Sequence, residues 1–281
     1  MMKLSRVNTL FVHASILCGI TLGFCMTGTC QGDLMVMPKR VVFEGNKRYE
    51  DLTVANIGND TATYVISFVQ VRMKQDGSFE MISTPDSAQF FSDKNVRYFP
   101  RSVTLGPNEA QTVKIQVTKK DQLGPGEYRS HLYFRAVPKV LPLEEKPVTD
   151  SSISIQLIPI YGISIPVILR LGLNDSGVSF AEASFKVAHD TLPLLTITFN
   201  RKGNMSVYGN VMIDHVSLEG KVTRVARVNG VAVYTPNTIR NMQVVLDHGH
   251  GVNYHSGKLH VTYSDQSSKN VTLAEQDVAL H

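Results

Sequence analysis

The stretch Ser152–Leu169, SISIQLIPIYGISIPVIL, decides the fold of this 281-residue chain. From Ile153 on, every second residue is apolar, aromatic or proline, whereas the other phase begins with Ser152, Ser154 and Gln156. This alternation is typical of a strand with one buried face at its beginning, and the apolar residues of both phases in its middle are typical of burial on both faces. The strand is long, since most strands have about five or six residues. We interpret its early part as carrying apolar side chains that its own domain does not fully cover; the alternative is an ordinary core strand.

Short segments rich in β-branched and aromatic residues precede the long strand and end at Gly, Pro, Asn or Asp. They predict the strands Val41–Phe43, Tyr49–Asn56, Thr63–Met73, Gln111–Thr118 and Glu127–Val137. Ser83–Asp93 could hold one or two helical turns, and the proline-rich segment Val137–Asp150 predicts an exposed loop. Strands at this spacing indicate an antiparallel β-sandwich.

A second series of strands follows Leu171. Its predicted members are Val178–Val187, Leu194–Asn200, Val207–His215, Lys221–Val228, Gly230–Tyr234, Met242–Leu246, Lys258–Tyr263 and Val271–Ala279. Asn229-Gly230 predicts a two-residue hairpin turn between two of them. We therefore expect an all-β protein with two β-sandwich domains, residues 33–170 and residues 171–281.

The first 32 residues have the pattern of a signal peptide. Lys3 and Arg6 form a positive start, and Thr9–Met26 is almost entirely apolar or small. Small residues before Gly32 predict cleavage near that position. An uncleaved anchor helix and a lipoprotein are the alternatives. Export across the inner membrane follows from the first interpretation.

Cleavage would remove Cys18, Cys25 and Cys30, which are all three cysteines of the chain. The mature chain would then form no internal disulfide, so its stability must come from burial of apolar side chains. An exported protein without disulfides suggests the bacterial envelope. The formal net charge is only +4 and basic residues are not clustered, which argues against nucleic acid as a partner.

The sequence holds no glycine-rich phosphate loop, no HExxH and no GxSxG motif. Asp247–Gly251 with His255 is the one cluster with metal-like side chains, and its glycines favour a flexible turn over a metal site. We expect no enzyme activity, no cofactor and no metal. A sandwich hydrolase or carbohydrate-binding module is a weaker alternative, since the chain has no Trp platform and no recognisable pair of carboxylates.

Several motifs precede the long alternating strand: Met37–Gly45 (MPKRVVFEG), Leu52–Asn56, Pro100–Leu105, Gln111–Ile115 and Glu127–Pro138. Together with that strand they resemble the PapD-like periplasmic chaperones of fimbria and pilus assembly. The resemblance covers Met37–Leu169, and beyond Leu171 it rests on a second sandwich of suitable size.

The resemblance implies two immunoglobulin-like domains set at an angle, with a cleft between them. It implies a periplasmic chaperone that caps pilin or fimbrial subunits by donor-strand complementation, with an outer-membrane usher as a further partner. On this basis Arg40 would anchor the subunit's C-terminal carboxylate, and Ile153, Ile155 and Leu157 would be the donor side chains.

The family's second anchor, a lysine on the last strand, would fall at Tyr161 or Gly162. No Lys or Arg occurs from Pro147 to Leu169, so the sequence predicts a single anchor. One anchoring arginine gives weaker and less oriented recognition than a pair of cations. The alternative function is a structural or adhesive envelope protein that uses the same sandwiches without an usher.

Ile155→Asp tests the donor assignment. We expect this substitution to abolish capture of periplasmic partners while the isolated protein stays folded, because a donor side chain is covered only by the partner. Pull-down and thermal unfolding measure the two effects. Unfolding of the isolated variant would instead identify Ile155 as core, since an unpaired buried charge costs several kcal/mol.

Overall fold

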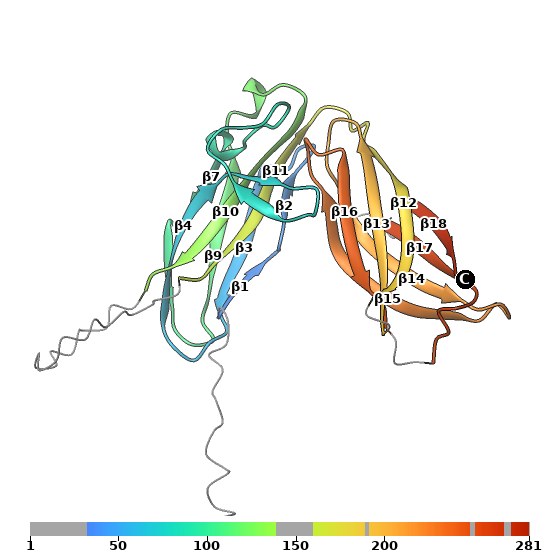
Figure 1. The fold of residues 1–281 in the computed structure, drawn as a ribbon. Helices are drawn as coiled ribbons and strands as arrows, with labels where there is room; N and C mark the ends of the chain where they lie inside the picture. The colour runs from blue at the N-terminus through green and yellow to red at the C-terminus, as the bar shows by residue number, and fades with distance from the viewer. Residues whose placement is uncertain (1–32, 139–159, 189–190, 248–250, 267–270, 281) are drawn as a thin grey trace, which may run out of the picture. The chain divides into compact units, whose positions relative to one another are not determined.

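The structure is a computed structural model that describes residues 33–138, 160–188, 191–247, 251–266 and 271–280 (Figure 1). The chain divides into Met1–Asp33 and one compact unit, Leu34–His281. Within the described ranges the only helices are two short 3₁₀ turns, η1 (Asp93–Asn95) and η2 (Lys120–Gln122). In this part of the chain, no helix is long and apolar enough to cross a membrane.

Two sheets form the first sandwich. One has the order β1 (Leu34–Met37), β3 (Tyr49–Asn56), β9 (Ala110–Val117), β7 (Val96–Phe99). The other has the order β2 (Val41–Phe43), β11 (Gly162–Leu171), β10 (Gly126–Ala136), β4 (Ala62–Val69), β8 (Ser102–Leu105). The first order corresponds to strands A-B-E-D of an immunoglobulin domain, and β11, β10 and β4 of the second sheet correspond to strands G-F-C.

The second sandwich joins a three-stranded and a four-stranded sheet. The first of these has the order β12 (Gly177–Ala188), β13 (Leu192–Lys202), β16 (Ile239–Val245). The other has the order β15 (Val222–Val233), β14 (Val207–Val216), β17 (Lys258–Asp265), β18 (Thr272–Ala279). The orders correspond to A-B-E and D-C-F-G, which is an immunoglobulin-like topology with the fourth strand moved beside the third. The prediction of an all-β protein with two immunoglobulin-like sandwiches is confirmed.

Each sandwich has its own hydrophobic core, and alternation along the strands builds it. In β14, Val211 and Ile213 are fully buried while Met212 between them is partly exposed. In β10, Leu132 and Phe134 are fully buried in the first core. Burial of apolar area at about 25 cal/mol per Å² is the main stabilising contribution to such a fold. The boundary between residues 170 and 171 stays a prediction.

The long strand Ser152–Leu169 is described only from Gly162, where β11 begins, and β11 runs two residues further than expected, to Leu171. Val167 and Leu169 face the core of the first sandwich. Ile168 between them is also fully buried, in a separate cluster with Tyr234. The burial of both faces that was predicted for the middle of the strand is found only at this end, because Ile160, Gly162 and Ser164 are exposed.

Two sequence predictions in the first sandwich were wrong. The single strand Thr63–Met73 is interrupted at Gln70: β4 stays in the sheet, and β5 (Val71–Met73) leaves it to pair with β6 (Phe79–Met81). The helical turns expected in Ser83–Asp93 are absent there, and η1 only begins at Asp93. The strands β1, β6, β7 and β8 have three or four residues each, which is too short for a clear alternation, and they were not predicted.

The hairpin predicted at Asn229-Gly230 was also wrong, because β15 runs through both residues. The register with β14 passes from Gly209↔Val231 to Val211↔Val228, which makes Asn229-Gly230 part of a β-bulge. Gly230 adopts a φ of 73°, and its N–H donates to Asn210 Oδ1 at 3.0 Å. A positive φ suits both a hairpin turn and a bulge, so the dipeptide alone could not distinguish them.

Gly209→Ala should destabilise the second sandwich. A Cβ at this position would lie 2.2 Å from the Ser264 carbonyl oxygen, which is backbone and cannot rotate away. We expect a loss of about 1–3 kcal/mol of unfolding free energy, measured by urea denaturation. Gly124→Ala is the matched control, since the nearest atom to a Cβ at that position, the Tyr128 hydroxyl oxygen, would be 3.9 Å away. Equal stability of the two variants would contradict the close approach of β14 and β17.

Candidate functional site: a cationic cavity beside an open strand edge

Arg40 lies at the point where the first strand of the sandwich changes sheets. β1 pairs with β3 in one sheet, whereas β2 pairs with β11 in the other. Pro38–Arg40 connects them, and Pro38 has no N–H to offer to either ladder. The half-buried Arg40 side chain leaves this connection and contacts the second sandwich.

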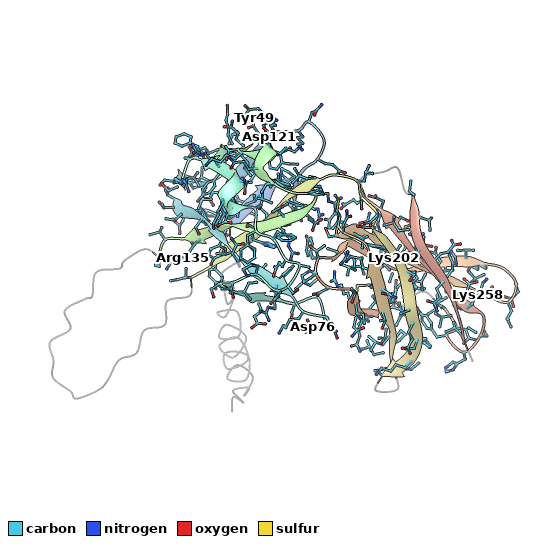
Figure 2. The ribbon with its side chains drawn as sticks, turned by 90° about the horizontal axis from the view of Figure 1, so that it is seen from above. Tyr49, Asp76, Asp121, Arg135, Lys202 and Lys258 are labelled. Carbon is cyan, nitrogen blue, oxygen red and sulfur yellow. The ribbon has the colours of Figure 1, made fainter. Side chains whose placement is uncertain are left out.

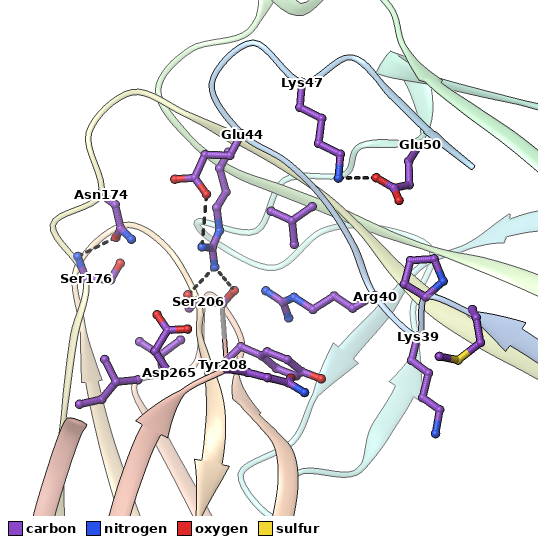
Figure 3. A pocket seen from close by; sticks show the side chains of 17 residues that line it. Lys39, Arg40, Glu44, Lys47, Glu50, Asn174, Ser176, Ser206, Tyr208 and Asp265 are labelled. Carbon is purple, nitrogen blue, oxygen red and sulfur yellow. Dashed lines mark hydrogen bonds and ion pairs between the residues drawn. The ribbon is translucent and has the colours of Figure 1, made fainter. Parts of the chain in front are cut away.

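Two tyrosines of the second sandwich hold the Arg40 guanidinium. Its Nη1 donates to the Tyr234 hydroxyl at 2.9 Å. Its Cζ lies 4.4 Å from the ring centroid of Tyr208 and 5.3 Å from that of Tyr234. Figure 3 shows the guanidinium close to Tyr208. Aromatic rings stabilise a cation without neutralising it, so Arg40 keeps its charge for a ligand.

Arg40 lines a cavity of about 740 Å³ together with residues of both sandwiches (Figure 3). Its other cations are Lys39, Lys47 and Arg170, and its carboxylates are Glu44, Glu50 and Asp265. Lys47 pairs with Glu50, and Arg170 pairs with Glu127 and Glu44. Among the described residues, Arg40 makes no ion pair. Arg40 is therefore available to an incoming carboxylate.

A buried network around Glu127 joins the two sandwiches. Glu127 accepts hydrogen bonds from the Ser206 N–H at 3.0 Å, the Ser206 hydroxyl at 2.6 Å and Arg170 Nε at 3.2 Å. Burial alone would raise the pKa of Glu127, but Arg170 and the Ser206 hydrogen bonds outweigh it and hold that pKa below its ordinary value. Arg170 is thus neutralised by its partners, whereas Arg40 is not.

Glu127 begins a row of buried polar residues on one face of β10, followed by Arg129 and His131. Arg129 Nη2 donates to the Thr235 carbonyl at 3.2 Å, and its Cζ lies 4.1 Å from the Tyr234 ring centroid. Burial, together with the charges of Arg129 and Arg40, lowers the pKa of His131 to about 3. His131 is therefore neutral near pH 7.

The outer edge of β11 is only partly covered. β10 pairs with β11 from Gly162 to Leu171, but on the other side β2 pairs only with Val167–Leu169. The Ala136 N–H donates to the Tyr161 carbonyl, so Tyr161 is hydrogen-bonded to β10. In an antiparallel pair such residues alternate with residues whose backbone groups point away from the partner strand. The N–H and C=O groups of Gly162 and Ser164 therefore point toward the other edge of β11. No described strand pairs with that edge before Val167. Such an edge is a template for a further strand.

Only one of the predicted site residues that the structure describes lies in this cavity. Arg40 lies in the cavity, and its role as an anchor remains a prediction. Ile153, Ile155 and Leu157 lie outside the described residues. Tyr161 and Gly162 are exposed to solvent. The Tyr133 ring contacts Gly162 so closely that a Cβ added at Gly162 would lie 2.4 Å from it.

Arg170 was not predicted, because it lies one residue beyond Pro147–Leu169, the segment in which the family's second cation was expected. The alternation Glu127, Arg129, His131 in β10 was a readable signal of a polar face, but the sequence did not show that the second sandwich buries it. The predicted metal-like cluster includes His248 and His250, which lie outside the described residues. No group of His, Cys, Asp or Glu in the rest of the described chain is arranged to hold a metal ion.

These features define a class of protein: two immunoglobulin-like sandwiches, a cationic cavity lined by both, and an open strand edge. No family model and no curated protein matches the chain in sequence. Its fold is similar to that of the YadV chaperone, at 12% identity and a TM-score of 0.44, with 89% of this chain and 100% of that chain covered. It is also similar to the Pseudomonas aeruginosa CupB2 chaperone, at 14% identity, a TM-score of 0.40, and 88% and 100% coverage.

A third similar structure is a chain of the complex between the Salmonella enterica SafA pilin and the SafB chaperone. Its identity is 13%, its TM-score is 0.39, and 90% of this chain and 98% of that chain are covered.

The low pKa of His131 predicts how stability responds to acid. The folded protein keeps His131 neutral down to about pH 3, whereas the unfolded chain takes up a proton near pH 6.5. The unfolding free energy should therefore fall with decreasing pH by up to about 1.4 kcal/mol per pH unit below pH 6.5. Urea denaturation between about pH 6 and 4.5 measures this slope.

His131→Phe removes the titrating group while keeping a ring beside Phe79, which lies 5.5 Å from the His131 ring. We expect this variant to lose most of the slope in the same pH range. Glu127 contributes in the same direction, because a lowered carboxyl pKa stabilises the folded state and this stabilisation is lost on acidification. Its contribution changes only below about pH 4.5. Identical slopes for the variant and the natural protein would show that His131 is not kept neutral by burial.

Proposed function

We propose that this protein is a periplasmic chaperone that caps subunits of pili or fimbriae by adding a strand. The observation that carries the proposal is the position of Arg40 at the end of the open edge of β11. Val41, the first residue of β2, pairs with Val167 of β11. Arg40 directly precedes Val41, so it lies where the part of the β11 edge that β2 covers meets the part that is open. A cation that makes no ion pair in the described chain and an unpaired strand edge therefore meet at one point.

This juxtaposition defines the direction of a bound strand. A strand that pairs with Gly162–Pro166 in the same direction as β11 would be in line with β2, which is itself parallel to β11. Its C-terminus would then point toward Arg40, and its carboxylate would meet the guanidinium. Backbone hydrogen bonds would supply affinity, and the carboxylate would set the register. A ligand strand that ends at Arg40 suits this edge better than an internal segment of a protein.

The donor side chains complete the proposal. Ile153, Ile155 and Leu157 precede β11 and have the same phase as Ile163 and Ile165, so one strand would present a continuous apolar row. These side chains would fill the groove of a subunit that lacks a strand. The partner would be folded and covered rather than chemically changed, and no cofactor or enzymatic step is needed.

Export belongs to the same proposal. Cleavage of a signal peptide near Gly32 would leave Asp33 close to the start of β1 at Leu34. The mature protein would act in the periplasm without any disulfide, and an outer-membrane usher would receive the capped subunits.

Arg40→Ala tests the anchor. The probe is a short synthetic peptide that alternates valine and threonine and ends in a free carboxylate, compared with its C-terminal amide. We expect Arg40→Ala to weaken binding of the free acid by on the order of 2–5 kcal/mol and to leave the amide nearly unchanged. Arg40→Lys should recover only part of the loss, since an ammonium group does not bind a carboxylate bidentately. Titration calorimetry measures each affinity.

The matched control is Arg101→Ala. Arg101 also lies over a tyrosine, with its Cζ 4.3 Å from the Tyr98 ring centroid, but it does not line the cavity. This variant should bind both peptides normally. Normal binding of the free acid by Arg40→Ala would contradict the anchor and favour a structural or adhesive envelope protein.

A further inference from the structure

We propose that Tyr234 of the second sandwich is a positioning residue that orients Arg40 and so makes the cavity selective for a carboxylate. The inference rests on the proposed function, because it concerns the same ligand. Binding of a carboxylate would then require a second residue besides Arg40. The residue that orients Arg40 belongs to the other sandwich, 194 positions away in the sequence.

The contact between the two side chains is directional. Arg40 Nη1 donates to the Tyr234 hydroxyl at 2.9 Å, which fixes the plane of the guanidinium as well as its place. An arginine side chain otherwise has many rotamers, and ordering them on binding costs affinity. One N–H is used by Tyr234, and the planar fork keeps further N–H donors for a carboxylate. Tyr234 therefore prepares the geometry that bidentate recognition needs.

Tyr234 is itself immobilised from several directions. It is 5% exposed and packs in a cluster with Met73, Ile168 and Ala232. The Arg129 guanidinium lies 4.1 Å from the centroid of its ring, and the Phe79 ring lies 6.1 Å away. A side chain this constrained can impose an orientation on a longer and more flexible partner.

The hairpin β5–β6, which carries Phe79, is bound to the second sandwich by hydrogen bonds. Asn237 Nδ2 donates to the Met73 carbonyl at 2.6 Å, and the Asn241 N–H donates to the Gln75 carbonyl at 2.6 Å. Asp76 marks the turn of this hairpin in Figure 2. The turn residue Gly77 lies against Arg240, where an added Cβ would be 2.6 Å from Arg240 Nη2. Tyr234 is thus supported by both sandwiches.

Tyr208 has a different part in the same cavity. Its half-exposed ring lies 4.4 Å from Arg40 Cζ and lines the cavity, so it stabilises the charge of Arg40. No hydrogen bond joins its hydroxyl to Arg40 among the described contacts. Orientation by a hydrogen bond is therefore specific to Tyr234, and Tyr234→Phe removes it while keeping the ring.

The experiment measures binding of the same free-acid and amide peptides to Tyr234→Phe. We expect the free acid to bind about tenfold more weakly and the amide to bind unchanged, since the lost hydrogen bond has a charged donor. Tyr98→Phe is the control: Tyr98 donates its buried hydroxyl to the Ile66 carbonyl and does not line the cavity. It should bind both peptides as the natural protein does. Thermal unfolding confirms that each variant is folded.

A double-mutant cycle with Arg40→Ala separates positioning from a general structural effect. If Tyr234 acts through Arg40, Tyr234→Phe should cause no further loss when Arg40 is already alanine. An equal loss in both backgrounds, or an equal loss for the amide, would overturn the positioning role. An unchanged affinity of Tyr234→Phe, with a clear loss in Arg40→Ala, would overturn it as well and leave the proposed function intact. Normal binding by Arg40→Ala would instead remove the anchor on which both depend.

Discussion

β2 covers β11 over three residues only, and the chemistry of the site follows from this incomplete pairing. The chain leaves the first sheet after β1 and joins the second at Val41, so β11 keeps an edge whose backbone groups have no strand beside them in the described chain. An exposed edge is a hazard for aggregation unless something specific is meant to pair with it. The connection that creates the edge also carries Arg40 to its end.

The surroundings of the two arginines explain why one is a candidate anchor and the other is structural. Arg170 faces Glu127 and the Ser206 carbonyl, so its charge is neutralised and it holds the sandwiches together. Arg40 is surrounded by tyrosine rings and makes no ion pair in the described chain. Breaking a buried ion pair such as Glu127–Arg170 costs about 3–5 kcal/mol. Arg170 therefore contributes to stability, whereas Arg40 is the cation that we propose for binding.

Alternation of apolar residues was sufficient to predict the two sandwiches, since strands such as β13 and β14 bury every second residue. It failed where a strand is very short, as in β6, or where a bulge uses the residues of a turn, as at Asn229-Gly230. Such features depend on neighbouring strands, which a local pattern does not include.

The site was predictable only in part. Arg40 came from a resemblance in the segment around β2, whereas its partner Tyr234 could not be paired with it from the sequence. Glu127 and Ser206 are 79 positions apart, and the polar face of β10 was visible without the surface that buries it. Contacts between the sandwiches are set by tertiary packing, so periodicity carries no information about them.

Hydrogen exchange at the edge of β11 tests the central claim most directly. The amides of Gly162 and Ser164 point away from β10, so they should exchange quickly in the free protein. Adding the free-acid peptide, or the subunit that co-purifies from the periplasm, should slow exchange at both amides together, because a bound strand takes up their hydrogen bonds. Unchanged exchange at Gly162 and Ser164 in a complex of demonstrated affinity would contradict binding by strand addition at this edge.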